Sequence, residues 1–151
     1  MKRVVITINR QYGSGGKTIG YMLAEKLGIP CYSREILQRA SEESGINESM
    51  FNARDERLKR LPKFLLSTNV YSGELLPPES KEFTSDQNLF NYEAEIIKKY
   101  AAEGSCVLIG RCADFVLKDD PDMISVYVHA DHDFQMKSAL ERVSMSEKEM
   151  E

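Results

Sequence analysis

The chain has 151 residues, 42% of them hydrophobic and 29% charged, and a formal net charge of −4. This length suits one domain that buries roughly two-thirds of its unfolded surface. The acidic balance argues against a nucleic-acid partner, for which a basic excess is typical, and no apolar run approaches the ~20 residues of a membrane span. The three cysteines are odd in number and lack metal-ligand spacing, so reduced thiols in the cytoplasm are expected.

The N-terminal stretch predicts a strand, a glycine-rich turn and a helix in succession. Residues 4–8 are a β-branched run typical of a buried parallel strand. The turn occupies residues 11–18, and apolar residues then recur at helical spacing from Ile19 to Leu27. A strand, a glycine-rich turn, Lys-Thr and a helix follow one another in this order in phosphate-binding P-loops.

This turn has the groups that a phosphate site needs. Backbone N–H groups can curl around an anion, and the helix N-terminus adds its partial positive charge. Lys17 can reach the outer phosphates, and the Thr18 hydroxyl can ligate Mg²⁺. The predicted nucleotide-binding residues are Gly13, Ser14, Gly15, Gly16, Lys17 and Thr18, with Thr18 as the metal ligand.

One position departs from the full P-loop pattern. Gln11 stands five residues before Gly16, where the pattern has glycine, so the first turn of the loop must be made differently. Gly13 and Gly15 supply flexibility nearby, which lets the loop close. The alternative interpretation is a glycine-rich connection between strand and helix that carries an exposed lysine.

A short strand and another helix follow. Gly28 suits the C-cap of the first helix, and residues 29–32 have room for only a short second strand. Ser33 predicts the N-cap of a helix that runs to about Ser44. Arg34 then lies near the carboxyl end of the second strand, where ligands gather in open α/β sheets. The alternative for this arginine is a solvated helix face.

From residue 47 to about residue 87 the pattern is weaker. The dense charge run at residues 54–60 predicts a solvated helix face. Some forty residues without a clear strand signal inside an α/β chain indicate an inserted region. We expect a mobile, mostly helical, substrate-binding insert at about 46–85. A surface loop is the alternative.

The remainder of the chain alternates helices with strands. The predicted elements are a helix from Asp86 to Gly104, a strand at 105–109, a short helix at 112–118, a strand at 123–128 and a helix through about Val143. With the first two strands, this makes four strands that alternate with helices. Such alternation predicts a parallel sheet with helices on both faces, a three-layer α/β fold.

The last residues predict one further helix. Ser146 and Glu149 have the spacing of a capping box, which announces a helix start two residues before the chain stops. We therefore expect a C-terminally incomplete domain whose sheet lacks its last strand. A sheet edge exposed in this way would allow self-association between chains.

Three segments of the chain resemble the cytidylate kinase-like proteins, a branch of the P-loop nucleoside monophosphate kinases. They are residues 9–20, 27–37 and 107–114. The first segment is the most specific, because that family uses this glycine-rich loop with a non-glycine residue at the place of Gln11. The resemblance covers most of the chain apart from the middle region. It implies a P-loop NTPase fold and phosphoryl transfer from ATP to CMP or dCMP with Mg²⁺.

The resemblance also implies roles for individual residues. Lys17 and Arg111 would be catalytic, and Arg111, Asp114 and Arg34 would bind the acceptor. Ser33 departs from the family, which commonly has aspartate there. These assignments agree with the chemistry, because phosphoryl transfer needs mainly positioning and positive charge around the transferred group.

Two other functions remain open from the sequence. One is a nucleotide-binding sensor or regulatory module without catalysis, and the other is a P-loop kinase for another small acceptor. Kinases of the family carry an arginine-bearing lid after the helix that begins near Asp131, and Arg142 lies in that neighbourhood. We expect this chain to bind nucleotide more readily than it turns it over, with no nucleic-acid or membrane partner.

Overall fold

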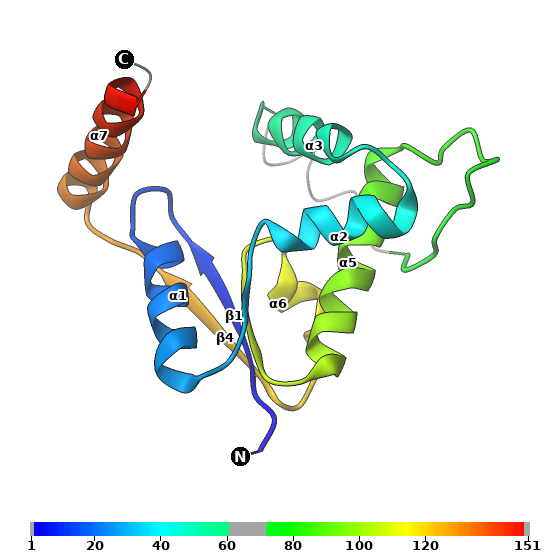
Figure 1. Cartoon of the computed structure of the whole chain (residues 1–151), viewed down its shortest axis with the longest axis horizontal. Helices are drawn as coiled ribbons and strands as arrows, with labels where there is room; N and C mark the ends of the chain where they lie inside the picture. The colour runs from blue at the N-terminus through cyan, green and yellow to red at the C-terminus, as the bar shows by residue number, and fades with distance from the viewer. Residues whose placement is uncertain (1, 61–71, 150–151) are drawn as a thin grey trace. The chain divides into compact units, whose positions relative to one another are not determined.

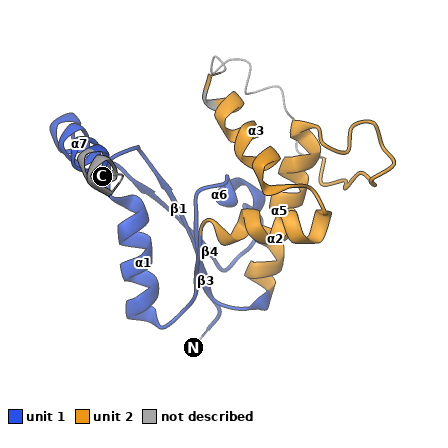
Figure 2. Ribbon diagram, turned by 45° about the horizontal axis from the view of Figure 1, so that its top comes forward, with its two compact units in different colours: residues 1–32, 103–151 blue, residues 33–102 orange. Residues whose placement is uncertain are grey.

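The computed structural model describes residues 2–60 and 72–149. These residues form two compact units, shown in Figure 2: residues 1–32 with 103–151, and residues 33–102. The predicted insert at about 46–85 falls in the second unit, although residues 61–71 of it lie outside the described residues. Its substrate-binding role stays a prediction. None of the helices in the described ranges is both long and apolar enough to cross a bilayer.

The first unit contains a four-stranded sheet. Its strands lie in the order β2-β3-β1-β4, and every neighbouring pair is parallel. The strands are β1 (Val5–Arg10), β2 (Cys31–Tyr32), β3 (Cys106–Ile109) and β4 (Met123–Val128). This arrangement confirms the predicted α/β fold with a parallel sheet. The predicted further strand concerns residues after Glu151 and stays a prediction.

The core of the first unit lies between the sheet and α1 (Gly16–Leu27). It contains Ile6, Ile8, Ala24, Val107 and Ile109, all buried. The helix approaches the strands closely at Gly20, where an added Cβ would lie 2.8 Å from Ile109 Cδ1. Figure 1 shows α1 on one side of β1 and the short α6 (Ala113–Val116) on the other, as a three-layer fold requires.

The second unit is helical. It comprises α2 (Glu35–Ser44), α3 (Glu48–Arg60) and nearly all of α5 (Asp86–Glu103). Each of the three helices buries apolar side chains. The buried side chains are Ile36, Leu37, Ala40, Phe51, Leu89, Ile96 and Ile97.

The prediction that residues 54–60 form a fully solvated face is wrong at Arg54. Its side chain is 12% exposed, and its Nη1 lies 3.7 Å from Oε1 of Glu93, which is 1% exposed. The guanidinium also lies 5.2 Å from the ring centroid of Phe90. Both partners belong to α5. The packing of α3 against α5 therefore buries one residue of the charge run, which the sequence pattern does not reveal.

Two predicted helix starts are also wrong. The helix α7 runs unbroken over His132–Glu149, so no new helix begins at Ser146. This stretch contains neither glycine nor proline to break it. At the second start, Arg34 occupies the N-cap of α2 in place of the predicted Ser33. The Ser33 N–H instead donates to Glu35 Oε2 over 2.9 Å.

Candidate active site

The loop between β1 and α1 closes on Ser14. Its backbone N–H and its hydroxyl both donate to Gln11 O, over 3.2 and 2.7 Å. Gly13 and Gly15 have φ angles of +76° and +80°, a left-handed conformation that glycine adopts without strain. Two predicted glycines thus make the turns, and the buried Ser14 holds the loop closed. The nucleotide-binding role of Ser14 stays a prediction.

The side chain of Gln11 explains the departure from the P-loop pattern. Its Oε1 accepts hydrogen bonds from Gln135 Nε2 at 3.0 Å and from the Ala130 N–H at 3.4 Å. The Gln11 N–H donates to Val128 O, at the end of β4, over 3.0 Å. Gly13 packs against the same region, because an added Cβ would lie 2.6 Å from Gln135 O. A glutamine at this position therefore attaches the loop to the start of α7, which glycine could not do.

The start of α1 leaves backbone donors for a ligand. The Ile19 N–H donates to Gly15 O over 3.0 Å, which is the first bond of the helix. The N–H groups of Gly16, Lys17 and Thr18 precede it and have no intrahelical acceptor. Such groups, together with the helix dipole, favour an anion at this end of the helix.

The loop borders a pocket of about 150 Å³. This volume suits a phosphate group, whereas pockets that enclose a whole drug-sized ligand are roughly 300–1,000 Å³. Three of its lining residues are cationic, and no acidic residue is among the described residues that line it. The lining residues are Arg10, Gln11, Tyr12, Gly13, Gly15, Gly16, Lys17 and Arg142. The pocket is therefore built for negative charge.

The lysine and threonine of the loop are both available to a ligand. Lys17 and Thr18 are exposed in the first turn of α1. The Thr18 hydroxyl forms no hydrogen bond with any described residue, which leaves it open to a cation. The described residues contain no cluster of three or more His, Cys, Asp or Glu side chains able to hold a metal ion. The donor set here fits Mg²⁺ of the kind that is held by one hydroxyl together with phosphate oxygens.

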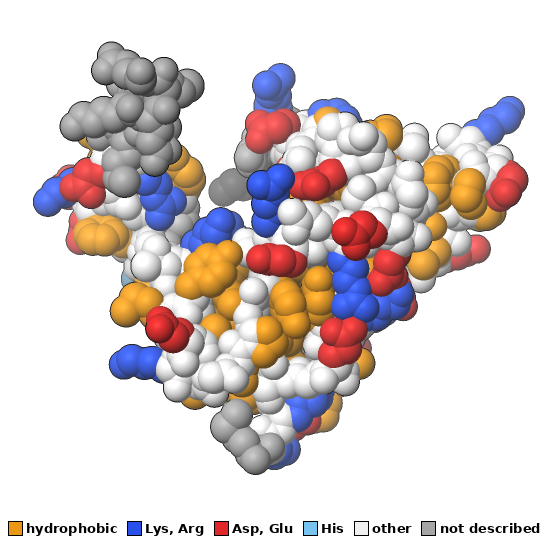
Figure 3. All heavy atoms as spheres, viewed as in Figure 1, with side chains coloured by type: hydrophobic (Ala, Val, Ile, Leu, Met, Phe, Trp, Pro, Cys, Tyr) orange, Lys and Arg blue, Asp and Glu red, His pale blue; other side chains and the backbone are white. Residues whose placement is uncertain are grey.

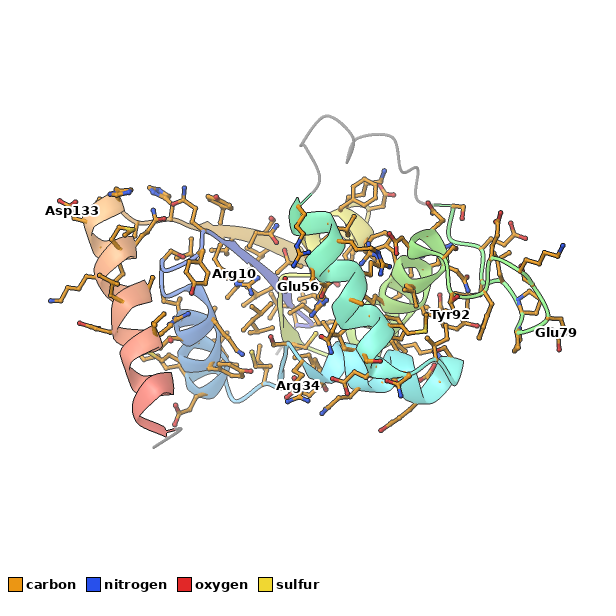
Figure 4. All side chains as sticks on the ribbon, turned by 90° about the horizontal axis from the view of Figure 1, so that it is seen from above. Arg10, Arg34, Glu56, Glu79, Tyr92 and Asp133 are labelled. Atoms are coloured by element: carbon orange, nitrogen blue, oxygen red, sulfur yellow. The ribbon has the colours of Figure 1, made fainter. Side chains whose placement is uncertain are left out.

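Arg10 is a functional candidate that the sequence analysis missed. It is the last residue of β1 and is labelled in Figure 4. An added Cβ at Gly16 would lie 2.5 Å from Arg10 Cβ, and an added Cβ at Gly110 would overlap Arg10 Nη1. The side chain therefore extends from the phosphate loop to the end of β3. Burial and the charge of Arg111 lower the pKa of Arg10. The sequence feature that could have identified Arg10 is its position between the first predicted strand and the glycine-rich loop.

Arg111 follows β3 in an unusual backbone conformation. Arg111 and Cys112 have φ angles of +60° and +54°, in the left-handed region that non-glycine residues rarely adopt. Strained backbone of this kind clusters at functional sites. Asp114 lies in the first turn of α6, directly after these residues. The structure thus brings Arg111 near Arg10, whose pKa the charge of Arg111 helps to lower, and Asp114 follows Arg111 closely in the chain.

Arg34 belongs to the second unit. It is 73% exposed, and its Nε is 3.5 Å from Glu48 Oε1. Figure 4 labels it at the start of α2. The predicted site residues are thus divided between the two units, with the loop, Arg111 and Asp114 in the first. The acceptor-binding role of Arg34 stays a prediction.

Comparisons with known proteins identify relatives of the chain. A sequence model described as the cytidylate kinase-like family matches residues 5–151. A crystal structure of an uncharacterized protein from Eubacterium ventriosum ATCC 27560 is similar, with 26% sequence identity and a TM-score of 0.60. That match covers 94% of this chain and 63% of the other, so the chain spans 63% of that protein's length. No curated protein matches the chain.

The family match extends over nearly the whole chain and includes the loop, β3 and the residues that follow it. The parallel sheet and the cationic pocket at the end of β1 agree with this assignment. The chain belongs to the cytidylate kinase-like family.

Proposed function

We propose that the chain is a nucleoside monophosphate kinase that transfers the γ-phosphoryl group of ATP to CMP or dCMP. The observation that carries this proposal is the pocket of phosphate size in which Arg10, Lys17 and Arg142 surround a glycine-rich loop. Because phosphoryl transfer depends mostly on positioning and on positive charge, a pocket of this kind provides what the reaction needs. Family membership supports a nucleotide as the ligand.

The donor phosphates would bind at the start of α1. The N–H groups of Gly16, Lys17 and Thr18 would donate hydrogen bonds to the phosphate oxygens, and the Lys17 ammonium would reach the outer phosphates. The Thr18 hydroxyl would hold Mg²⁺, which would supply further positive charge beside the phosphate groups of ATP. The three backbone N–H groups belong to the first turn of α1, so they would need little reorganisation to meet the phosphates.

The acceptor phosphate would bind at the end of β3. Arg111 offers a planar guanidinium, which matches two phosphate oxygens at once. Its left-handed backbone directs the chain from β3 into α6, where Asp114 follows. Arg34 in the second unit is a further proposed acceptor ligand.

Substitution of Lys17 and Arg111 should separate donor from acceptor binding. Lys17→Ala removes a charge directed at the transferred group and should lower kcat by roughly 10²–10³-fold. Arg111→Ala should raise the KM for CMP by about tenfold or more and leave ATP binding within a factor of two. Lys26→Gln, at the opposite exposed end of α1, is the control for loss of one positive charge.

Steady-state turnover of ATP with CMP, dCMP, UMP and AMP tests the proposal directly. Turnover with CMP or dCMP is expected. ATP binding without turnover of any acceptor would instead favour a nucleotide sensor, and turnover with a different acceptor would favour another kinase. Unchanged CMP kinetics in Arg111→Ala would show that the acceptor site is assigned wrongly.

A further inference from the structure

We propose that Arg10 binds the terminal phosphate of the donor, the group that is transferred, and is thereby a catalytic residue. This inference rests on the proposed function, but it concerns a residue outside the P-loop sequence itself. The side chain begins at the phosphate loop beside Gly16 and ends over Gly110. It therefore spans the interval between the donor phosphates and Arg111, the interval that the phosphoryl group must cross.

The charge of Arg10 has no acidic partner among the described residues. Five other arginines of the described part lie within 4 Å of a carboxylate: Arg3, Arg34, Arg39, Arg54 and Arg57. Arg10 instead faces another cation, Arg111, and lines a pocket that also contains Lys17. Like charges held together in this way are unfavourable until an anion enters between them. The missing counter-charge fits a phosphate.

The backbone of the site leaves room for the guanidinium. Gly110 has a φ of +71°, and a side chain there would overlap Arg10 Nη1. The absence of a side chain at position 110 thus makes room for the arginine head directly before Arg111. A donor that is held in place before the reaction costs no reorganisation in the transition state. Space for the guanidinium at this end of β3 is thus built into the backbone, and the exposed side chain stays open to a ligand that enters the pocket.

The chemistry of arginine suits this place better than that of lysine. A guanidinium donates two parallel hydrogen bonds to oxygens of one phosphate, whereas an ammonium acts as a point charge. The charge that develops on the transferred group is spread over three oxygens. Arg10→Lys should therefore keep the charge yet lose much of the rate.

The test compares ATP with ADP, because only ATP carries the terminal phosphate. Calorimetry on wild type, Arg10→Ala and Lys26→Gln measures both affinities. Arg10→Ala should weaken ATP binding by about tenfold and leave ADP binding within a factor of two. Lys26→Gln should change neither. Equal weakening of ATP and ADP in Arg10→Ala, or no weakening of either, would overturn the proposal.

Turnover provides the second readout. Arg10→Ala should lower the transfer rate by roughly 10²-fold or more, and Arg10→Lys by about tenfold. Added guanidinium ion at millimolar concentration should partly restore Arg10→Ala, whereas sodium chloride at equal ionic strength should not. Such rescue would not occur if Arg10 served only to hold the fold. An Arg10→Ala variant that transfers phosphate as fast as wild type without any added salt would contradict a catalytic role.

The two proposals fail in different ways. If wild type transfers phosphate to no acceptor but prefers ATP over ADP, and Arg10→Ala loses this preference, Arg10 still binds the terminal phosphate and the kinase function falls. If wild type phosphorylates CMP and Arg10→Ala does so equally well, the kinase function stands and the assignment of Arg10 falls. Thermal melts of each variant test whether the fold is retained.

Discussion

At the scale of single residues, Gln11 couples the phosphate loop to the connection between β4 and α7. Its Oε1 accepts from both Gln135 Nε2 and the Ala130 N–H. The net contribution of one such hydrogen bond to the free energy of unfolding is about 1 kcal/mol. The loop conformation thus depends on residues more than a hundred positions away in the chain.

Gln11→Ala should lower the free energy of unfolding by about 1–2 kcal/mol, because it removes two hydrogen bonds. Gln135→Ala should lower it by a similar amount, and the double variant should cost less than the sum, since both remove the same contact. Urea unfolding measures these values. Gln38→Ala, at an exposed position of α2, is the matched control. Full additivity of Gln11→Ala and Gln135→Ala would contradict the coupling.

At the scale of secondary structure elements, a buried ion pair joins α3 to α5. Arg54 lies over Phe90 and beside Glu93, the most deeply buried carboxylate of the described residues. A buried pair contributes little compared with apolar packing, but removal of one partner leaves a buried charge and costs about 3–5 kcal/mol.

Arg54→Leu should therefore destabilise the chain by about 3–5 kcal/mol in urea unfolding. Addition of Glu93→Gln should recover part of this loss, because it removes the uncompensated charge. The control is Arg57→Leu, which changes a more exposed arginine of the same helix and should cost less than about 1 kcal/mol. An Arg54→Leu variant no less stable than Arg57→Leu would show that the buried pair is unimportant.

The start of β1 is joined to the turn before β4 by a second charge cluster. Arg3 donates to Asp120 and, over 3.1 Å, to Asp122 Oδ2, and the Val5 N–H donates to Asp122 O. The Arg3 guanidinium lowers the pKa of Asp120 by its hydrogen bond. The folded pKa thus lies below the unfolded value of about 3.9. The resulting stabilisation is complete above about pH 4 and is lost as the pH falls through the folded pKa.

Wild type should therefore lose stability below about pH 4 more steeply than Arg3→Gln, which lacks the hydrogen bond to Asp120. Urea unfolding at pH 2.5, 3, 4 and 7 measures the difference between the two proteins. The curves should be furthest apart at pH 7 and approach each other in acid. Parallel curves across this range would contradict the role of Arg3.

The elements were more predictable than the contacts between them. Strands and helices could be located because β-branched runs, helical spacing and glycine C-caps such as Gly28 and Gly45 act locally. The glycine loop was found for the same reason. The contacts of Arg10, Gln11 and Arg54 could not be predicted, because they involve Gly110, Gln135 and Glu93, which lie far away in sequence.

At the scale of the whole molecule, apolar side chains remain exposed on the first unit. Among the described residues β4 pairs with β1 alone, and its Ile124 and Tyr127 are exposed. Figure 3 shows hydrophobic side chains on the surface of α1 and α7 as well. The exposed large apolar residues of these two helices include Ile19, Met22, Phe134, Met136, Leu140 and Val143. Exposed sheet edges and apolar faces favour association.

Self-association through the β4 edge is therefore expected to appear in sedimentation velocity as a mass that rises with protein concentration. Ile124→Lys should shift the distribution toward the monomer, since lysine on an edge strand opposes pairing. Met50→Lys places the same charge on the second unit and should have no effect. A monomer at all concentrations would contradict the prediction.

The central claim is that the loop between β1 and α1 holds ATP for phosphoryl transfer to a cytidine monophosphate. Single-turnover transfer from γ-³²P-labelled ATP, with protein in excess over ATP and with CMP and Mg²⁺ present, tests it most directly. Wild type should produce labelled CDP, and Lys17→Ala should produce almost none. Bound ATP with no labelled CDP or dCDP from wild type, or equal label from Lys17→Ala, would contradict the account.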